Sequence, residues 1–162
     1  MILIALGANL PSAAGSPEET LRAALASLGA RGITVERQSG FYVSEAWPNP
    51  ADPPFVNAVA SVRTSLKPAD LLRVLHEVEA EFGRAGGPRN APRTLDLDLI
   101  DYDHRIEHGE PELPHPRMET RAFVLVPLLD IAPDWRHPVS GRTIAELVAD
   151  AGPAKVTMLA PG

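Results

Sequence analysis

The sequence predicts an α+β fold: a ferredoxin-like sandwich with a central, mostly antiparallel sheet and helices packed on it. Alternating apolar residues mark the strands, and helical spacing with capping signals marks the helices. These elements follow one another as strand, helix, strand, strand, helix, strand, which is the split βαβ pattern of ferredoxin-like folds. The chain has 162 residues, 44% of them hydrophobic, and shows neither an internal repeat nor a break in composition. Residues 1–162 are therefore expected to form one domain, with residues 153–162 as an extended or frayed tail.

The first half of the chain contains a helix and three expected strands. Met1 to Gly7 is a short apolar run that predicts the first strand. Ser16, Pro17 and Glu19 form a capping signal, so a helix should begin there and end near residues 29–32. Strands are expected over residues 33–43 and 55–64. Between them lies EAWPNPADPP, whose prolines exclude regular structure and favour a preformed binding edge.

Pro68 opens the second expected helix, which Gly83 should end, and Glu77, Glu79 and Glu81 lie on its predicted outer face. A strand over residues 93–102 and a hairpin around residues 105–112 follow. The apolar stretch 121–131 should be partly helical, with Pro127 as an interruption. A capping box at 143–146 begins a short helix that runs to about residue 150.

Composition excludes several functional classes. The chain contains no cysteine, which excludes disulfides and thiolate metal sites, and its first residues lack the pattern of a signal peptide. No run of about 18 apolar residues occurs, so we expect no membrane span. The formal net charge of −6 argues against nucleic acid as a partner. We expect a monomeric, cytoplasmic protein.

The segment RTLDLDLIDY at residues 93–102 carries the sharpest chemical signal. Its alternation places the leucines on one face of a strand and Asp96 and Asp98 on the other. The two aspartate Cα atoms should then lie about 6.5 Å apart, so that both carboxylates reach one cation. Carboxylate oxygens on a rigid strand suit Mg²⁺, which completes its shell with water and substrate phosphates. The alternative is an exposed strand face with solvated aspartates.

Arg84, Arg89 and Arg93 precede that strand in a glycine-rich segment without acidic residues. Arginine binds phosphate oxygens with a planar fork, so this loop beside paired carboxylates indicates a phosphate site. The alternative is a surface loop with solvated arginines. Neither a Walker loop nor a dinucleotide-binding G-x-G-x-x-G occurs. A bound nucleotide would therefore depend on arginines and Mg²⁺.

His115, held between two prolines and six residues before Arg121, is a candidate donor to a phosphate oxygen, with a structural turn histidine as the alternative. His104 and His108 are four residues apart in a turn-rich stretch without a carboxylate motif. We interpret them as surface residues rather than metal ligands.

Five segments together resemble the 6-hydroxymethyl-7,8-dihydropterin pyrophosphokinase family. They are GANL near the start, FVN at 55–57, GR at 83–84, PRTLDLDLI at 92–100 and LPHPRMETRAFVLVPLLDIAP at 113–133. The resemblance runs in the family's order from Ile2 to about Val148. It implies a ferredoxin-like α+β fold and transfer of the diphosphate of ATP to the hydroxymethyl group of the pterin, with release of AMP.

The resemblance also implies a role for individual residues. Asp96 and Asp98 would hold two Mg²⁺ ions, and Arg84 and Arg93 would act with them in catalysis. The ATP side would comprise Glu79, Arg84, Arg89, Arg93, His115 and Arg121. The pterin side would comprise Ser44, Ala46, Phe55, Asn57 and Phe123, with the two phenyl rings on either face of the heterocycle.

The chain departs from the family at Asn90 and Ala91, where the family has tryptophan and glycine, and its arginine loop is about one residue shorter. Ser44 and Glu45 stand where the family has threonine and proline, and Trp47 replaces an aliphatic residue. Two other functions remain open from the residues alone. One is a module that binds a nucleotide or pterin without turnover, and the other is a Mg²⁺-dependent phosphotransferase with a different acceptor.

Overall fold

The computed structural model describes residues 1–45, 51, 53–83, 94–153 and 156–159. In the first half of the chain the elements are β1 (Ile2–Ala8), α1 (Pro17–Ala30), β2 (Thr34–Gln38), β3 (Tyr42–Ser44), β4 (Phe55–Arg63) and α2 (Pro68–Glu81). In the second half they are β5 (Asp96–Tyr102), β6 (Glu107–His108), β7 (Glu112–Leu113), a 3₁₀ turn η1 (Met118–Thr120), α3 (Ala122–Ile131), α4 (Ile144–Ala151) and β8 (Val156–Met158).

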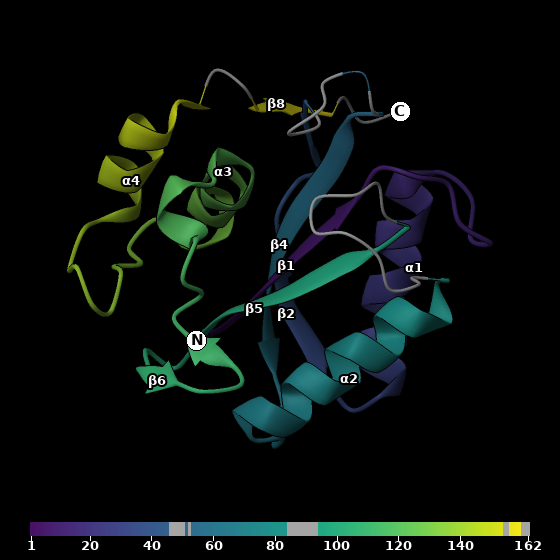
Figure 1. Ribbon diagram of the computed structural model, residues 1–162, viewed down its shortest axis with the longest axis horizontal. Helices are drawn as coiled ribbons and strands as arrows, with labels where there is room; N and C mark the ends of the chain where they lie inside the picture. Colours follow the sequence, from purple (N-terminus) through teal and green to yellow (C-terminus); the bar gives the residue numbers. More distant parts are fainter. Residues whose placement is uncertain (46–50, 52, 84–93, 154–155, 160–162) are drawn as a thin grey trace.

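The main sheet has the strand order β5-β1-β4-β3-β8, and β2 also pairs with β4. The pairs within this sheet are antiparallel. The sheet lies between two layers of helices, with α1 and α2 on one face and α3 and α4 on the other (Figure 1). The predicted α+β class, with a mostly antiparallel sheet under packed helices, is confirmed.

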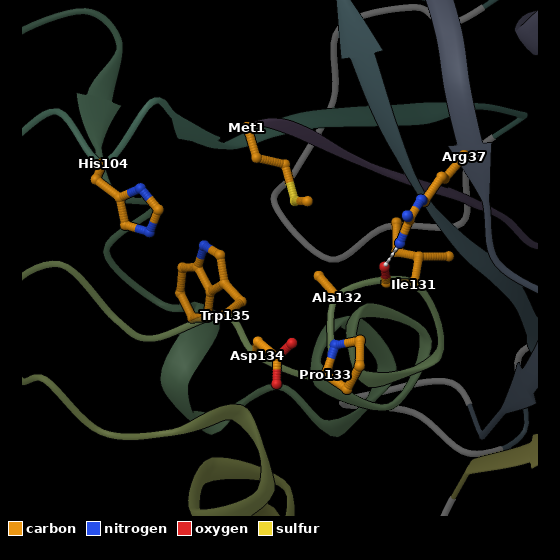
Figure 2. A pocket seen from close by; sticks show the side chains of 8 residues that line it. All are labelled: Met1, Arg37, His104, Ile131, Ala132, Pro133, Asp134 and Trp135. Atoms are coloured by element: carbon orange, nitrogen blue, oxygen red, sulfur yellow. Dashed lines mark hydrogen bonds between the residues drawn. The ribbon is translucent and has the colours of Figure 1, made fainter.

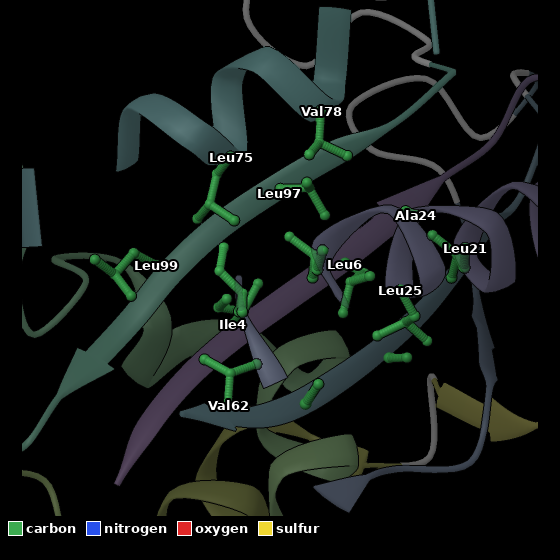
Figure 3. Packing of buried hydrophobic residues seen from close by; sticks show 14 of the residues in the cluster. Ile4, Leu6, Leu21, Ala24, Leu25, Val62, Leu75, Val78, Leu97 and Leu99 are labelled. Carbon is green, nitrogen blue, oxygen red and sulfur yellow. The ribbon is translucent and has the colours of Figure 1, made fainter. Parts of the chain in front are cut away.

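Alternation along the strands divides the apolar residues between two cores. Ile4 and Leu6 of β1 and Leu97 and Leu99 of β5 pack under α1 and α2 (Figure 3). On the opposite face, Leu3, Val59 and Ile100 pack with α3 and α4. The leucines of β5 are thus buried as predicted, and the side chains between them lie on the α3 face.

The capping box at the start of α1 forms in full, and at the start of α4 the side-chain cap of Thr143 forms. The Ser16 side chain accepts from the Glu19 backbone N–H while the Glu19 carboxylate accepts from the Ser16 N–H, which satisfies two amide groups at the start of α1. Thr143 accepts from the Glu146 N–H at the start of α4. The expected starts of these helices are confirmed.

The single strand expected over residues 33–43 is wrong in one respect, because it is divided into β2 and β3. Ser39 leaves the regular ladder, and its hydroxyl accepts the Val59 N–H that a strand carbonyl would otherwise accept. Gly40 then donates its N–H to the Asp130 carboxylate at 2.8 Å. The chain therefore bends at the Ser39-Gly40 step and continues as β3.

The expected interruption at Pro127 is also wrong, since α3 is continuous from Ala122 to Ile131. Proline has no N–H, so the helix lacks the bond to the carbonyl four residues earlier. Pro127 is itself buried, and most of the helix packs against β4 and α4. Burial of this apolar surface outweighs the missing bond.

In the tail, the described residues 156–158 form an extended strand, β8, which is one of the two conformations expected there. Val156–Met158 pairs with β3 antiparallel, and Ser44 lies opposite Val156. The Leu159 N–H donates to the Phe41 carbonyl at 2.7 Å. The strand that carries Ser44 therefore has neighbours on both sides.

Candidate active site

Neighbouring strands bring the candidate residues into one cross-strand row. Asp96 of β5 pairs with Gly7 of β1, and Gly7 pairs with Asn57 of β4. Asp98 pairs with Ala5, whose side chain belongs to the core under α3 and α4. Directly paired residues point to the same face of a sheet, so this row and both aspartates face the α3 side.

Helix α3 crosses this face of the sheet. Before the helix, the His115 N–H donates to the Ile100 carbonyl of β5, and at its other end the Asp130 carboxylate accepts from Gly40 beside β3. Ten residues of helix span about 15 Å, which matches the width of the four strands from β5 to β3. The row Asp96–Gly7–Asn57 lies on this face near the start of β5.

Asp96 and Asp98 are both half-buried, whereas Leu95 and Leu97 beside them are buried. The predicted geometry of the pair, two carboxylates on one face with solvent access, is therefore present. Within the residues that the structure describes, no three His, Cys, Asp or Glu side chains gather as a metal cage. The donor set suits a cation that takes one or two protein carboxylates and fills its shell with water and phosphate oxygens.

Glu79 does not lie on an outer helix face. Its side chain is buried, and one carboxylate oxygen accepts the Leu97 N–H at 2.8 Å. The expectation that Glu79 shares an exposed face with Glu77 and Glu81 is wrong. The edge strand β5 leaves this N–H without a strand partner, and the Glu79 carboxylate fills that role. This bond fixes the backbone between Asp96 and Asp98.

Gly7 leaves a gap in the floor of the row between Asp96 and Asn57. A side-chain carbon at this position would lie 3.2 Å from the Asn57 Oδ1 atom and 3.9 Å from the Phe55 ring. The glycine thus keeps open the space between the carboxylate end of the row and Asn57.

Asn57 and Ser44 form a buried polar pair. The Asn57 Nδ2 atom donates to the Ser44 hydroxyl at 2.8 Å, and the two residues are 3% and 8% exposed. The bond fixes the orientation of the Asn57 amide, so that its oxygen points towards Gly7. A buried, preoriented amide can recognise a flat polar heterocycle.

Arg121 and Phe123 lie together at the start of α3. The guanidinium carbon of Arg121 is 5.6 Å from the centre of the Phe123 ring, a cation–π distance. Phe123 is one of the few large apolar side chains with an exposed surface, at 36%. Phe55 begins β4 and is half-buried on the same face as Asn57.

The His115 ring is fixed by its own turn. Its Nδ1 atom accepts the Arg117 N–H at 3.2 Å, which directs the second ring nitrogen, Nε2, away from this turn. A neutral imidazole that accepts at Nδ1 carries its proton on Nε2. His115 can therefore donate from Nε2, in line with its predicted role.

The predicted site residues Ala46, Arg84, Arg89 and Arg93 lie outside the described residues.

Two residues near the site were not predicted individually from the sequence, although both belong to the GANL segment of the family resemblance. They are Gly7 and the buried Asn9, whose side chain donates to the Pro53 carbonyl at 3.1 Å and so ties the end of β1 to the proline-rich segment.

Tyr42 extends the row on β3, opposite Asn57. Its burial, the nearby Asp130 charge and its hydrogen bond to Asp130 together raise the pKa of Tyr42 to about 12. The phenol therefore stays protonated at neutral pH and links β3 to the end of α3.

A separate hollow of about 250 Å³ lies at the opposite end of the β1–β5 pair (Figure 2). Met1, Arg37, His104, Ile131, Ala132, Pro133, Asp134 and Trp135 line it. None of them belongs to the row, so this hollow is distinct from the candidate site.

None of the described helices is long and apolar enough to cross a membrane.

Residues 3–133 match the family model described as 7,8-dihydro-6-hydroxymethylpterin-pyrophosphokinase (HPPK). Two bacterial relatives carry the name 2-amino-4-hydroxy-6-hydroxymethyldihydropteridine pyrophosphokinase. The one from Synechocystis sp. is 43% identical over 162 residues, which are 99% of this chain and 80% of the relative. The one from Pseudomonas aeruginosa is 42% identical over 151 residues, with 91% and 90% of the two chains covered.

Solved structures with the same fold include a Plasmodium falciparum HPPK-DHPS with pteroate, at a TM-score of 0.69 and 13% identity. Another is an HPPK-DHPS in complex with substrates, at a TM-score of 0.68 and 12% identity. Each match covers 92% of this chain but only 42% of the solved chain, so this chain spans less than half of those proteins. At such low identity these structures support the fold alone.

Proposed function

This chain belongs to the 7,8-dihydro-6-hydroxymethylpterin-pyrophosphokinase family, and from that membership we propose a role in the reaction for each of its site residues. The enzyme transfers the diphosphate of ATP to the hydroxymethyl group of 6-hydroxymethyl-7,8-dihydropterin and releases AMP, a step of folate synthesis. The observation that carries our assignment is one face of the sheet, on which two half-buried carboxylates, a gap at Gly7 and a fixed amide lie together.

In our proposal Asp96 and Asp98 hold two Mg²⁺ ions against the triphosphate of ATP. The spacing of the carboxylates along one strand, their partial exposure and their hard oxygen donors fit this ion. When bound, Mg²⁺ supplies neutralisation of the charge on the phosphoryl oxygens. Glu79 keeps the two carboxylates in register by holding the Leu97 N–H between them.

The nucleotide side comprises His115 and Arg121, with Glu79 nearby. The Nε2–H of His115 is directed away from its own turn, and Arg121 keeps its five donors in a fork suited to phosphate. By resemblance to the family, Arg84, Arg89 and Arg93 complete this side as phosphate clamps. The excess of positive charge offsets the negative charge of the triphosphate and of the leaving AMP.

The pterin side comprises Phe55, Asn57 and Phe123, together with Ser44 and, by resemblance, Ala46. The Asn57 amide, fixed by Ser44, offers a hydrogen bond to the polar edge of the heterocycle. The two phenyl rings suit its flat faces through offset stacking. This places the hydroxymethyl group over the gap at Gly7, towards the carboxylate end of the row.

Positioning and charge stabilisation are the main contributions of the site, because diphosphoryl transfer requires no covalent intermediate with the protein. The hydroxyl oxygen of the pterin attacks the β-phosphorus, the bond from that phosphorus to the α-phosphate oxygen breaks, and AMP leaves. The hydroxyl proton is released to solvent or phosphate oxygen, so no side chain must act as a strong base.

We further propose that residues 1–162 form one domain that works as a monomer in the cytoplasm. The two cores lie on either side of one sheet, and no further core occurs elsewhere in the described residues, which supports the single domain. Size-exclusion chromatography with light scattering would measure the mass directly.

Asp98→Asn tests the metal assignment. The substitution keeps the shape of the side chain and removes its charge, so the fold should persist while AMP release falls by about 100-fold or more, since the metal contributes several kcal/mol. Asp134→Asn, at an exposed carboxylate away from the row, is the matched control and should retain wild-type turnover. Normal turnover of Asp98→Asn, with the same Mg²⁺ dependence, would refute the assignment.

A further inference from the structure

Glu119 and His137 form a polar contact outside the residues assigned above. The Nε2 atom of His137 lies 3.4 Å from a carboxylate oxygen of Glu119. Glu119 belongs to η1, directly before Arg121, whereas His137 lies in the connection between α3 and α4. His115 and Arg121, the two proposed ATP ligands, lie on either side of η1 in the turn of residues 115–121. The contact therefore joins this turn to a segment that follows helix α3.

The His137 ring has a defined orientation and tautomer. Its side chain is 5% exposed, and its Nδ1 atom accepts the N–H groups of Val139 at 3.2 Å and Ser140 at 3.1 Å. Because Nδ1 is an acceptor in both bonds, the proton resides on Nε2, which faces Glu119. The contact is thus a polar contact between a buried ring nitrogen and a half-exposed carboxylate, at 3.4 Å.

The other ties of the turn lie on its inner side. The His115 N–H donates to the Ile100 carbonyl of β5 at 2.9 Å, and the Met118 side chain is fully buried in the core under α3 and α4. The Glu119 side chain contacts His137, which lies in a different segment of the chain. It therefore adds a tie to a second segment of the chain, beyond those to β5 and the core.

The far end of this contact is anchored to the same strand. The Trp135 ring meets the His137 ring edge-on at 5.9 Å between centres, and its Nε1 atom donates to the fully buried Asp101 carboxylate at 2.9 Å. On its other side Trp135 stacks with His104, as Figure 2 shows. Asp101 lies on β5 three residues after Asp98.

These contacts form a closed ring. It runs from Ile100 and Asp101 of β5 through Trp135 and His137 to η1, and from there through His115 back to β5. A closed ring of mostly buried contacts fixes relative positions better than one contact alone, because each contact limits the motion of the next.

We propose that Glu119 and His137 are positioning residues for ATP, which hold His115 and Arg121 at a fixed position relative to Asp96 and Asp98. Neither residue contacts substrate. This inference rests on the proposed function, since it takes His115 and Arg121 as the ATP side of the site.

The experiment compares Glu119→Ala with His137→Asn. Asparagine reproduces the Nδ1 acceptor for Val139 and Ser140 but lacks the Nε2–H. This variant therefore keeps the hydrogen bonds to those two N–H groups and loses only the contact with Glu119. Both variants should raise the KM for ATP by about 3- to 10-fold, the effect expected from the loss of one polar contact, with the KM for pterin within about 2-fold of wild type. Glu119→Gln keeps an acceptor oxygen and should restore the wild-type KM for ATP.

Glu112→Ala, which removes an exposed carboxylate of β7, is the matched control and should change neither KM. An unchanged KM for ATP in Glu119→Ala, or a parallel rise of both KM values, would overturn the inference. Arg121→Ala is measured alongside. If Arg121→Ala raises the KM for ATP and Glu119→Ala does not, only this inference fails. If Arg121→Ala has no effect, the assignment of the ATP side fails, and the inference with it.

Discussion

Single residues of the row show how local sequence sets the chemistry of the site. Two aspartates at alternate positions must share a face of a strand, and the structure places them as the alternation predicts. Their position opposite Gly7 and Ala5 depends on the register between β5 and β1, which comes from packing of the leucines on the other face. Local sequence thus predicts the pair, and the sheet determines its surroundings.

Phe123→Ala is expected to weaken pterin binding by about 1 to 3 kcal/mol, because the variant loses a stacking surface and buried apolar area. Phe123 is exposed at the start of α3, so its removal leaves the fold intact. Titration of the pterin, followed by fluorescence or calorimetry, measures the change. A variant with normal pterin affinity and weakened ATP affinity would show that the two sides of the site are assigned wrongly.

Tyr42 predicts a dependence of stability on alkaline pH. In the unfolded chain its phenol ionises near pH 10, whereas in the fold its pKa is about 12. The folded state therefore binds this proton more tightly, and its contribution to stability is complete below pH 10 and is lost as pH rises through 12.

Tyr42→Phe removes that proton. Between pH 9 and 11 the free energy of unfolding of the wild type should fall more than that of the variant, by on the order of 1 kcal/mol. Urea unfolding at several pH values measures both slopes. Equal slopes would show that Tyr42 titrates alike in the folded and unfolded chains.

At the scale of elements, helices with strong end signals were the most predictable. Capping boxes and flanking glycines gave α1, α2 and α4 with nearly the observed bounds. Two predictions failed where tertiary contacts override local preference: Ser39 interrupts a strand by bonding to Val59, and burial keeps α3 continuous through Pro127. Such contacts join residues far apart in sequence, so periodicity does not reveal them.

Strand β8 offers a test at this scale. It pairs with β3, whose Ser44 holds the Asn57 amide. A chain that ends at Gly152 should leave β3 as an open edge, lose about 1 to 3 kcal/mol of stability and raise the KM for pterin several-fold, with the KM for ATP unchanged. A chain that ends at Leu159 keeps β8 and serves as the control. If both truncated chains bind pterin equally well, β8 has no part in the site.

At the scale of the whole molecule, the two faces of one sheet have different roles. The face under α1 and α2 is a closed apolar core, while the other is covered by α3 and α4 and carries the row of site residues. The sequence predicted the fold class, and the site residues were assigned largely through family resemblance. It did not predict the burial of Glu79 or the contact of Glu119 with His137, because both depend on the docking of separate elements.

The most direct test of the central claim is AMP release from ATP and Mg²⁺, measured with and without 6-hydroxymethyl-7,8-dihydropterin, with the pterin product identified by mass. We expect AMP only when the pterin is present, in equal amount to a pterin that carries two additional phosphates. ATP binding without AMP release would contradict this account and indicate a module that binds without turnover. AMP or ADP release that is indifferent to the pterin would also contradict it and indicate a different acceptor.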